Sequence, residues 1–418
     1  MNTKPLTPNH YAAAFAELDH LLITFQAIWR PSPFTEDNLD WQLNFPELHQ
    51  ALLVLSDQQL AEFEDESILL RWMADYITPL ASCSAWQIVP FDGELIDMPR
   101  FADVGMPGRK KQQIIGFSAA VAHQHQGLVP VPKKDKVVDW CSGKGFLARQ
   151  LHFVTGQPLT CLEYDKTLCQ AGEQFAASHG DDIHFIEQDV LADIDPQVIN
   201  GASLHTALHA CGDLHVRMLQ TAAKAHSPHI ALSPCCYHLT RHSQYHKLSA
   251  EAERSTLQLS KADLRLAVLQ TVTAGARVKR LREQELIWRI GYDLLCREVT
   301  GVEQYQPTPS VNKKWLSGLF VDYCRFMAAQ QQLVLPQAFD DGPLLEGRLE
   351  ALLDKAVIKV QGIKRLEKAR LAFRKALEYW LILDRALYLQ QQGYAVDVCL
   401  FCETAVSPRN ALIQGVLL

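Results

Sequence analysis

Acidic residues end three successive short apolar segments of this 418-residue sequence, and a glycine-containing turn follows the first of them. That turn, after the apolar pair 137–138, holds Asp139, Cys141, Ser142, Gly143 and Gly145. Glycines let the backbone turn sharply and let a ligand lie against it. An acid just before the turn suits a ligand with a positively charged end, such as an amino group. We therefore expect a small-molecule site here.

The later acids add contacts that a nucleoside needs. Glu163 follows the second apolar segment, where a carboxylate can accept hydrogen bonds from both hydroxyls of a ribose. Asp189 follows the third segment, where an acid or its neighbouring amide can read an adenine edge. His209, at the end of the fourth segment, is assigned to the same site. Together these positions predict a nucleoside-containing ligand with a cationic end.

Two ligands fit this description. The run from Gly143 to Ala148 satisfies the G-x-G-x-x-A pattern of nicotinamide and flavin dinucleotide sites. A pyrophosphate, however, needs a helix N-terminus without nearby anions, and Asp139 would lie close to it. S-adenosylmethionine carries an ammonium group and a single carboxylate, so it tolerates this acid and uses it. The turn therefore favours S-adenosylmethionine as cofactor and methyl transfer as the reaction.

The fourth and fifth apolar segments end in side chains that can move protons. Asp213 and His215 follow the fourth segment, and His238 follows the fifth. The methyl group on a sulfonium is already activated, so the protein mainly has to align a nucleophile and exclude water. A hydroxyl or a protonated nitrogen also needs a base, and these three residues are the candidates.

The run Cys235-Cys236-Tyr237-His238 allows three interpretations. It is structural if the cysteines are small buried residues and the histidine is a hydrogen-bonded loop residue. It is a substrate pocket if Tyr237 stacks on a base or ring while His238 accepts a proton. It is a zinc site if both cysteines, His238 and Cys211 bind the metal, but adjacent cysteines lack the usual separation of two to four residues. We therefore expect no metal.

The candidate residues can form one site only if the ends of the apolar segments that they follow lie close together in the fold. From about residue 136, short apolar segments recur every 20–25 residues or so, which is the length of a strand plus its crossover helix. Helical patterns follow at 277–298, 311–330 and 345–392. Two late strands, 395–401 and 411–416, are joined by so short a loop that they must pair antiparallel.

The fold class is therefore α/β, with a Rossmann-like class I methyltransferase sheet of five parallel strands plus a terminal antiparallel pair. The same patterns divide the chain into four parts. These are an acidic N-terminal helical region (1–105), the cofactor-binding half of the methyltransferase domain (106–240), a large helical insertion (241–392) and the terminal strand pair (393–418).

The composition favours a cytoplasmic protein. No apolar run approaches the roughly 18 residues that span a bilayer, so no membrane partner is expected. The N-terminus lacks the basic, apolar and small-residue order of a signal peptide. The 11 cysteines are scattered through a long chain, which is typical of thiols in a reducing compartment. The sequence leaves the oligomeric state open.

The net charge of −7 is unevenly distributed. Residues 1–105 hold 16 acidic and 4 basic residues, whereas the remainder holds 31 acidic and 36 basic ones. Basic residues cluster at 277–282 and 355–375. Such clusters are either solvated helix faces or a path for an anionic partner such as RNA. In the second case the acidic N-terminal part would face away from the RNA.

Four stretches carry a resemblance to a known group: Asp139-Trp-Cys-Ser-Gly-Lys-Gly145, His209-Ala-Cys-Gly-Asp-Leu214, Ser233-Pro-Cys-Cys-Tyr-His238 and Ser407-Pro-Arg-Asn410. They resemble methyltransferases that include the glutathione S-transferase C-terminal-domain-containing protein and methyltransferase-like protein 25. The paired-cysteine loop is more distantly similar to that of the tRNA 2′-O-methyltransferases that modify the acceptor stem. Lys110 and Lys111 lie in a segment that resembles the one preceding the fold in this group.

The resemblance implies a methyl donor at the turn residues, Glu163 and Asp189, and a substrate side formed by Asp213, Cys235, Cys236 and His238. His215 is a further catalytic candidate. The substrate-binding candidates are Lys110, Lys111 and Tyr237. Two features depart from wider patterns: the first departs from methyltransferases in general, although the closest relatives share it, and the second departs from the tRNA enzymes. Cys141 replaces the first glycine common in methyltransferases, and no cysteine–histidine zinc-finger segment precedes the fold as in the tRNA enzymes.

The leading hypothesis is a methyltransferase that acts on RNA, either tRNA or rRNA. The alternatives are a methyltransferase of proteins or small molecules, and a scaffold that binds S-adenosylmethionine without transferring its methyl group.

Overall fold

The computed structural model describes residues 4–127, 136–269, 276–309, 311–312, 314–335 and 342–418, which divide into two compact units. The first unit is formed by Met1–Thr24, Pro79–Gln270 and Arg374–Leu418, and the second by Phe25–Thr78 and Thr271–Phe373. Each unit thus combines segments that lie far apart in the sequence. The four-part division made from the sequence remains a proposal.

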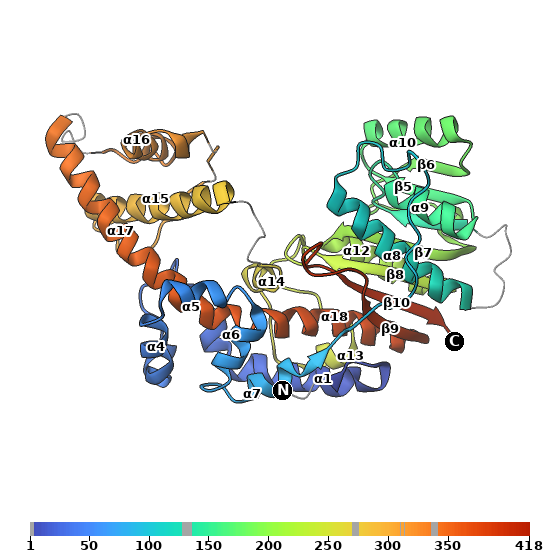
Figure 1. The fold of residues 1–418 in the computed structure, drawn as a ribbon, viewed down its shortest axis with the longest axis horizontal. Helices are drawn as coiled ribbons and strands as arrows, with labels where there is room; N and C mark the ends of the chain where they lie inside the picture. The colour runs from blue at the N-terminus through green and yellow to red at the C-terminus, as the bar shows by residue number, and fades with distance from the viewer. Residues whose placement is uncertain (1–3, 128–135, 270–275, 310, 313, 336–341) are drawn as a thin grey trace. The chain divides into compact units, whose positions relative to one another are not determined.

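In the described residues, the first unit holds an eight-stranded sheet with the order β3-β9-β10-β8-β7-β4-β5-β6 (Figure 1). Its strands are β3 (Val89–Pro90), β4 (Lys136–Trp140), β5 (Leu159–Glu163), β6 (Ile183–Glu187), β7 (Ala202–Cys211), β8 (His229–Cys235), β9 (Tyr394–Leu400) and β10 (Ala411–Leu417). Strands β4 to β8 are mutually parallel, and β10 runs antiparallel to both β8 and β9. The predicted class I methyltransferase sheet is confirmed.

Short strands from the N-terminal region were not anticipated. Strand β3 pairs parallel with β9 at the edge of the sheet. A separate parallel pair joins β1 (Lys4–Pro5) to β2 (Trp86–Gln87). Each of these strands has two residues, which is too short for an alternating apolar pattern to appear in the sequence.

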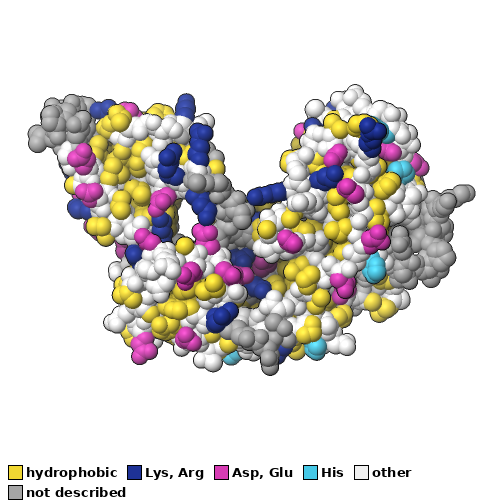
Figure 2. Space-filling model, in the orientation of Figure 1, with side chains coloured by type: hydrophobic (Ala, Val, Ile, Leu, Met, Phe, Trp, Pro, Cys, Tyr) yellow, Lys and Arg dark blue, Asp and Glu magenta, His cyan; other side chains and the backbone are white. Residues whose placement is uncertain are grey.

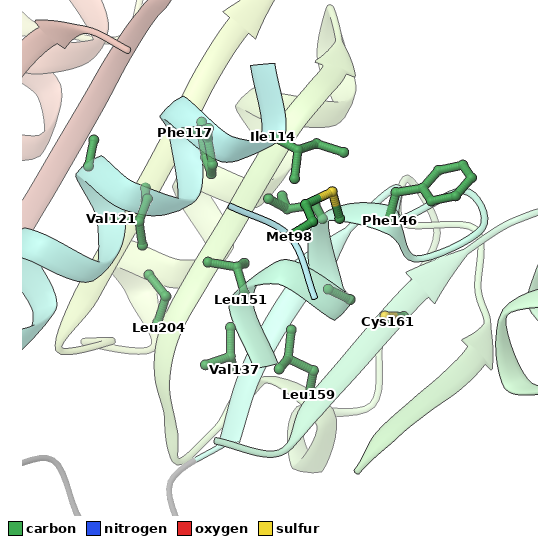
Figure 3. Close-up of a cluster of buried hydrophobic side chains, with 14 of the residues drawn as sticks. Met98, Ile114, Phe117, Val121, Val137, Phe146, Leu151, Leu159, Cys161 and Leu204 are labelled. Carbon is green, nitrogen blue, oxygen red and sulfur yellow. The ribbon is translucent and has the colours of Figure 1, made fainter. Parts of the chain in front are cut away.

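Helices α8 (Gly108–Gly127), α9 (Phe146–Thr155) and α10 (Lys166–His179) pack on one face of this sheet. Their apolar side chains join those of the strands in one buried cluster. In Figure 3, Phe117 and Val121 of α8 and Leu151 of α9 lie beside Val137 and Leu204 of the strands. Removing a buried side chain of this kind costs about 2–5 kcal/mol of folding free energy. This cluster therefore fixes the strand ends that carry the candidate site.

The other helices of the first unit are α1 (Tyr11–Thr24), α7 (Pro79–Ser84), α11 (Pro196–Ile199), α12 (Asp213–Lys224), α13 (Ala250–Arg254), α14 (Lys261–Ala267) and α18 (Arg374–Gln391), with the short 3₁₀ helix η1 (Pro8–His10). Helix α12 packs against β7 and β8, whereas α18 packs against β9 and β10. Helices α1, α13 and α14 in turn contact α18. Neither α12 nor α18 contributes a described residue to the cluster of Figure 3.

The second unit is helical in its described residues. It contains α2 (Gln26–Trp29), α3 (Trp41–Asn44), α4 (Pro46–Leu53), α5 (Asp57–Glu62), α6 (Glu66–Met73), α15 (Ala276–Thr300), η2 (Trp315–Ser317), α16 (Phe320–Gln330) and α17 (Gly342–Leu371). The helical pattern predicted at 345–392 is interrupted at Ala372-Phe373, so that its two halves belong to different units. None of the helices in the described part of the chain is both long and apolar enough to cross a membrane.

The closest packing of α8 on the sheet depends on Gly116. A Cβ atom at this position would lie 2.0 Å from the carbonyl oxygen of Phe401, just beyond β9. We expect Gly116→Ala to lower the free energy of unfolding by about 1–3 kcal/mol, because a backbone atom cannot move aside. Gly108→Ala, at the open start of the same helix, has no atom within 4 Å and should leave stability unchanged. Urea unfolding of both variants measures this, and equal midpoints would contradict the close approach.

Candidate active site

The turn after β4 is held in a left-handed backbone conformation. Cys141, Gly143 and Gly145 have φ angles of 58°, 59° and 71°. The Ser142 hydroxyl donates to the Asp139 carbonyl at 2.8 Å, which closes the turn. A Cβ atom at Gly145 would lie 2.5 Å from the Phe185 ring, whereas one at Gly143 would meet nothing within 4 Å. Gly145 is therefore needed for packing, and the open side at Gly143 is where a ligand can approach.

Glu163, the last residue of β5, reaches this turn. Its Oε2 accepts a hydrogen bond from the Gly143 N–H at 2.8 Å, and its Oε1 accepts one from the Asp165 N–H at 2.9 Å. The carboxylate therefore links the turn after β4 to the start of the loop after β5. Asp189, two residues beyond β6, is exposed and accepts from the Leu191 N–H at 2.9 Å.

Asp139 is the most unusual acid of the site. Its side chain is only 2% exposed, and its Oδ2 atom has no hydrogen-bond partner among the described residues. Burial raises its pKa to about 8, although the hydroxyl of Ser142 and the positive charge of Lys110 act in the opposite direction. A buried carboxyl oxygen that lacks a hydrogen-bond donor costs folding free energy. The ammonium group of a methionine moiety would supply that donor, so the residues present fit S-adenosylmethionine.

The half-buried Cys141 thiol lies at the meeting point of these groups. Its pKa is raised to about 12 by burial first, and then by Glu163, Asp139, Cys211 and Asp189 in that order. These four groups lie at the ends of β4, β5 and β7 and in the loop after β6, and all of them act electrostatically on the Cys141 thiol. The structure thus brings the predicted cofactor acids together beside a residue of the predicted substrate side.

On the substrate side, three cysteines gather at the ends of β7 and β8. The Sγ atoms of Cys211 and Cys235 are 3.3 Å apart, and Cys236 completes the group. A hydrogen bond from Cys235 is the main cause that lowers the pKa of Cys211 to about 6, and Arg409 acts in the same direction. The hydrogen bond with Cys211 and then burial raise the pKa of Cys235, whereas burial and then the hydrogen bond with Cys211 raise that of Cys236. The thiol of Cys211 is therefore more readily deprotonated than those of its two neighbours.

Two histidines border these cysteines. His238 is half-buried, and its Nδ1 has no hydrogen-bond partner among the described residues. Burial, Arg265 and Arg409 lower its pKa, so its imidazole is neutral at pH 7. His209 forms a short hydrogen bond with Gln113, and desolvation, Lys110 and Arg409 lower its pKa. The charges of Lys110, Arg265 and Arg409 thus act on histidines at the carboxyl ends of β7 and β8.

Comparison with known proteins identifies the kind of domain. Residues 109–243, which include β4 to β8 and the turn at Asp139, match a family model described as a methyltransferase domain. The chain contains a methyltransferase domain. Its strand order is that of the sheet predicted from the sequence, whose class uses S-adenosylmethionine as methyl donor.

Solved structures that match part of this chain share little sequence with it. The tRNA (uracil-54, C5)-methyltransferase of Pyrococcus abyssi is 16% identical, with a TM-score of 0.22, over 28% of each chain. An S-adenosylmethionine-dependent methyltransferase of Clostridium acetobutylicum is 14% identical, with a TM-score of 0.23, over 28% of this chain and 48% of its own. The magnesium protoporphyrin IX methyltransferase of Synechocystis is 13% identical, with a TM-score of 0.25, over 33% and 61%.

The alignments thus span less than two thirds of each of these structures. Among curated proteins, none matches the chain significantly.

Two residues predicted to act on the substrate are instead buried in the methyltransferase domain. His215 is fully buried; its Nδ1 bonds the Ala210 carbonyl at 3.0 Å, and its Nε2 accepts from Arg385 Nε at 2.9 Å. Tyr237 is 2% exposed, and the Arg385 guanidinium lies 4.8 Å from the centre of its ring. Neither side chain can reach a substrate, because α18 supplies the arginine that covers both. We therefore correct these assignments and consider the pair positioning residues for the paired-cysteine loop.

Asp213 and Lys111 form structural contacts. Asp213 begins α12, and its Oδ2 accepts from the Arg241 N–H at 2.7 Å, which ties the loop after β8 to this helix. Lys111 forms ion pairs with Asp103 at 3.0 Å and Asp97 at 3.4 Å. Lys110, in contrast, acts on Asp139, and burial lowers its own pKa. Of the two predicted lysines, only Lys110 is thereby associated with the site residues.

Arg409 and Gln113 are site residues that the residue patterns did not single out. Arg409 acts on Cys211, Cys236, His209 and His238. It belongs to the stretch 407–410, which carried the family resemblance, so a signal for it was present in the sequence. Gln113 gave no signal, because a single glutamine in a helix is ordinary.

The two basic clusters, 277–282 and 355–375, differ in whether their side chains are bonded within the protein or exposed. Within 355–375, side chains bond backbone carbonyls of the N-terminal helices: Arg365 to Leu55, Lys368 to Phe63 and Arg370 to Trp29. Their structural role is therefore clear. The cluster at 277–282 keeps its basic side chains exposed, although Lys279 pairs with Glu64 at 3.1 Å. Figure 2 shows lysine and arginine gathered on this unit where α15 and α16 lie.

Proposed function

We propose that this chain transfers the methyl group of S-adenosylmethionine to RNA. The observation that carries the donor half is the buried Asp139 carboxyl group, whose Oδ2 has no hydrogen-bond partner among the described residues, beside the open turn at Gly143. Glu163 lies where it can exchange its bond to the Gly143 N–H for bonds from ribose hydroxyls. Lys110, Arg409 and Arg265 support the acceptor half, because their charges favour a phosphate backbone near His238 and His209.

In the proposed reaction, different residues bind the donor, accept the proton and position the loop after β8. S-adenosylmethionine supplies an activated methyl group on its sulfonium when it is bound. Asp139 holds the ammonium end of the donor, and Glu163 holds its ribose. His238, neutral at pH 7, accepts the proton of an attacking hydroxyl or nitrogen of the RNA. His215 and Tyr237 keep the loop that carries His238 in place.

The acceptor class is tested by offering tritiated methyl donor and the purified protein to cell extract. RNA, protein and small molecules are then separated and counted. We expect label in the RNA fraction, because the cations at the acceptor side favour a polyanion. The same extract treated with an Asp139→Asn variant provides the background.

Label confined to the protein or small-molecule fraction would contradict the RNA proposal while leaving methyl transfer intact. Donor binding without label in any fraction would favour the scaffold alternative.

A further inference from the structure

The three cysteines at the ends of β7 and β8 form a group that the proposed methyl transfer leaves unexplained. Their sulfur atoms all lie within 4.8 Å of one another, and those of Cys211 and Cys235 are 3.3 Å apart. In the described residues, this is the one group of three or more cysteine, histidine or acidic ligand atoms within such distances. Two tetrahedral zinc–sulfur bonds of about 2.3 Å hold their sulfurs about 3.8 Å apart. The observed spacing spans that value.

The backbone explains how adjacent cysteines can face one point. Successive side chains of an extended strand point to opposite faces, so Cys235 and Cys236 would not face one metal ion if the strand continued unbroken. Strand β8 ends at Cys235, and Cys236 has a φ of 46°, in the left-handed region that few non-glycine residues adopt. This change of direction brings the sulfur of Cys236 to the same side as that of Cys235. Their partner Cys211 comes from the end of the neighbouring strand.

The surrounding charge suits a thiolate-bound divalent cation. Three thiolates and one Zn²⁺ carry a net charge of −1, and Arg409 acts electrostatically on both Cys211 and Cys236. We propose that Cys211, Cys235 and Cys236 bind one zinc ion at the ends of β7 and β8. The three protein ligands leave a fourth position for water or a ligand atom of the substrate, as in catalytic zinc sites.

A disulfide explains the group less well. A bond between Cys211 and Cys235 would leave the thiol of Cys236 unexplained. A metal, in contrast, uses all three sulfurs at once. A zinc ion here would link the ends of β7 and β8, which carry the acceptor side. Cys141 of the donor turn lies near enough to Cys211 to be affected by its charge.

The full-length protein, purified without chelator, should contain about one zinc ion per chain by elemental analysis. Exchange into Co²⁺ should produce sulfur-to-cobalt charge-transfer absorption together with the visible bands of tetrahedral cobalt. Cys236→Ser should lose most of the zinc and weaken the charge-transfer band, because one thiolate is removed. Cys402→Ser, which changes a half-buried cysteine outside the group, should retain both signals.

Folded, reduced wild-type protein that holds no zinc and gives no charge-transfer band with Co²⁺ would overturn the proposal. A Cys211–Cys235 or Cys235–Cys236 disulfide found by peptide mapping of the native protein would also overturn it. Because metal content is measured without donor or acceptor, failure of this proposal is distinguishable from failure of methyl transfer.

Discussion

Asp139→Asn is expected to weaken the binding of S-adenosylmethionine roughly 100-fold, because it removes the buried charge that pairs with the ammonium group. Asparagine keeps the shape of the side chain. The ligand-free Asp139 is already neutral at pH 7, since burial raises its pKa to about 8. The variant should therefore fold as the wild type does. Isothermal titration measures the affinity, and Asp165→Asn, an exposed acid that caps α10, serves as a matched control.

The pH dependence of the same titration provides a second test of Asp139. Its carboxyl must lose a proton to pair with an ammonium group, so donor affinity should rise by up to about tenfold per pH unit below pH 8. The variant should lack this rise. For the ligand-free protein the sign is opposite: the folded-state pKa is raised, so Asp139 makes the fold less stable as the pH increases from about 4 toward 8. An unchanged affinity in Asp139→Asn at every pH would exclude the ion pair.

His238→Ala is expected to lower kcat about 100-fold or more while leaving donor affinity unchanged, because it removes the proton acceptor but not the donor site. Burial and the nearby arginines lower the pKa of His238, so wild-type turnover should stay high somewhat below pH 6.5. Single-turnover methyl transfer to RNA measures the rate. His242→Ala changes an exposed histidine of the same loop and should behave as the wild type.

An equal loss of donor affinity in His238→Ala would place this residue at the cofactor rather than at the acceptor. An unchanged kcat would show that the proton leaves by another route.

The sheet and the positions of three acids at its edge were predictable because the strand ends follow from the spacing of apolar segments. Asp139 and Glu163 lie at the ends of β4 and β5, and Asp189 lies two residues beyond β6. In a parallel sheet the carboxyl ends of neighbouring strands meet at one edge, so spacing along the chain becomes proximity in space. The late antiparallel pair was predictable for a similar reason, since a short loop permits no parallel crossover.

The acceptor side was harder to predict, because burial depends on segments that are distant in sequence. His215 and Tyr237 look like reactive groups in a motif, yet Arg385 in α18, 170 residues beyond His215, covers both. Arg409 reaches the cysteines from the loop before β10. The left-handed turn at Cys236 likewise leaves no mark in a pattern of residue types. Side chains supplied by the last helix and strands thus decide what a local motif can do.

Titration of S-adenosylmethionine into the folded full-length protein tests most directly that the turn at Asp139 binds the methyl donor. We predict saturable binding that Asp139→Asn and Glu163→Ala both weaken strongly. Absence of any binding to folded protein would contradict the assignment of the turn and, with it, the proposed methyl transfer.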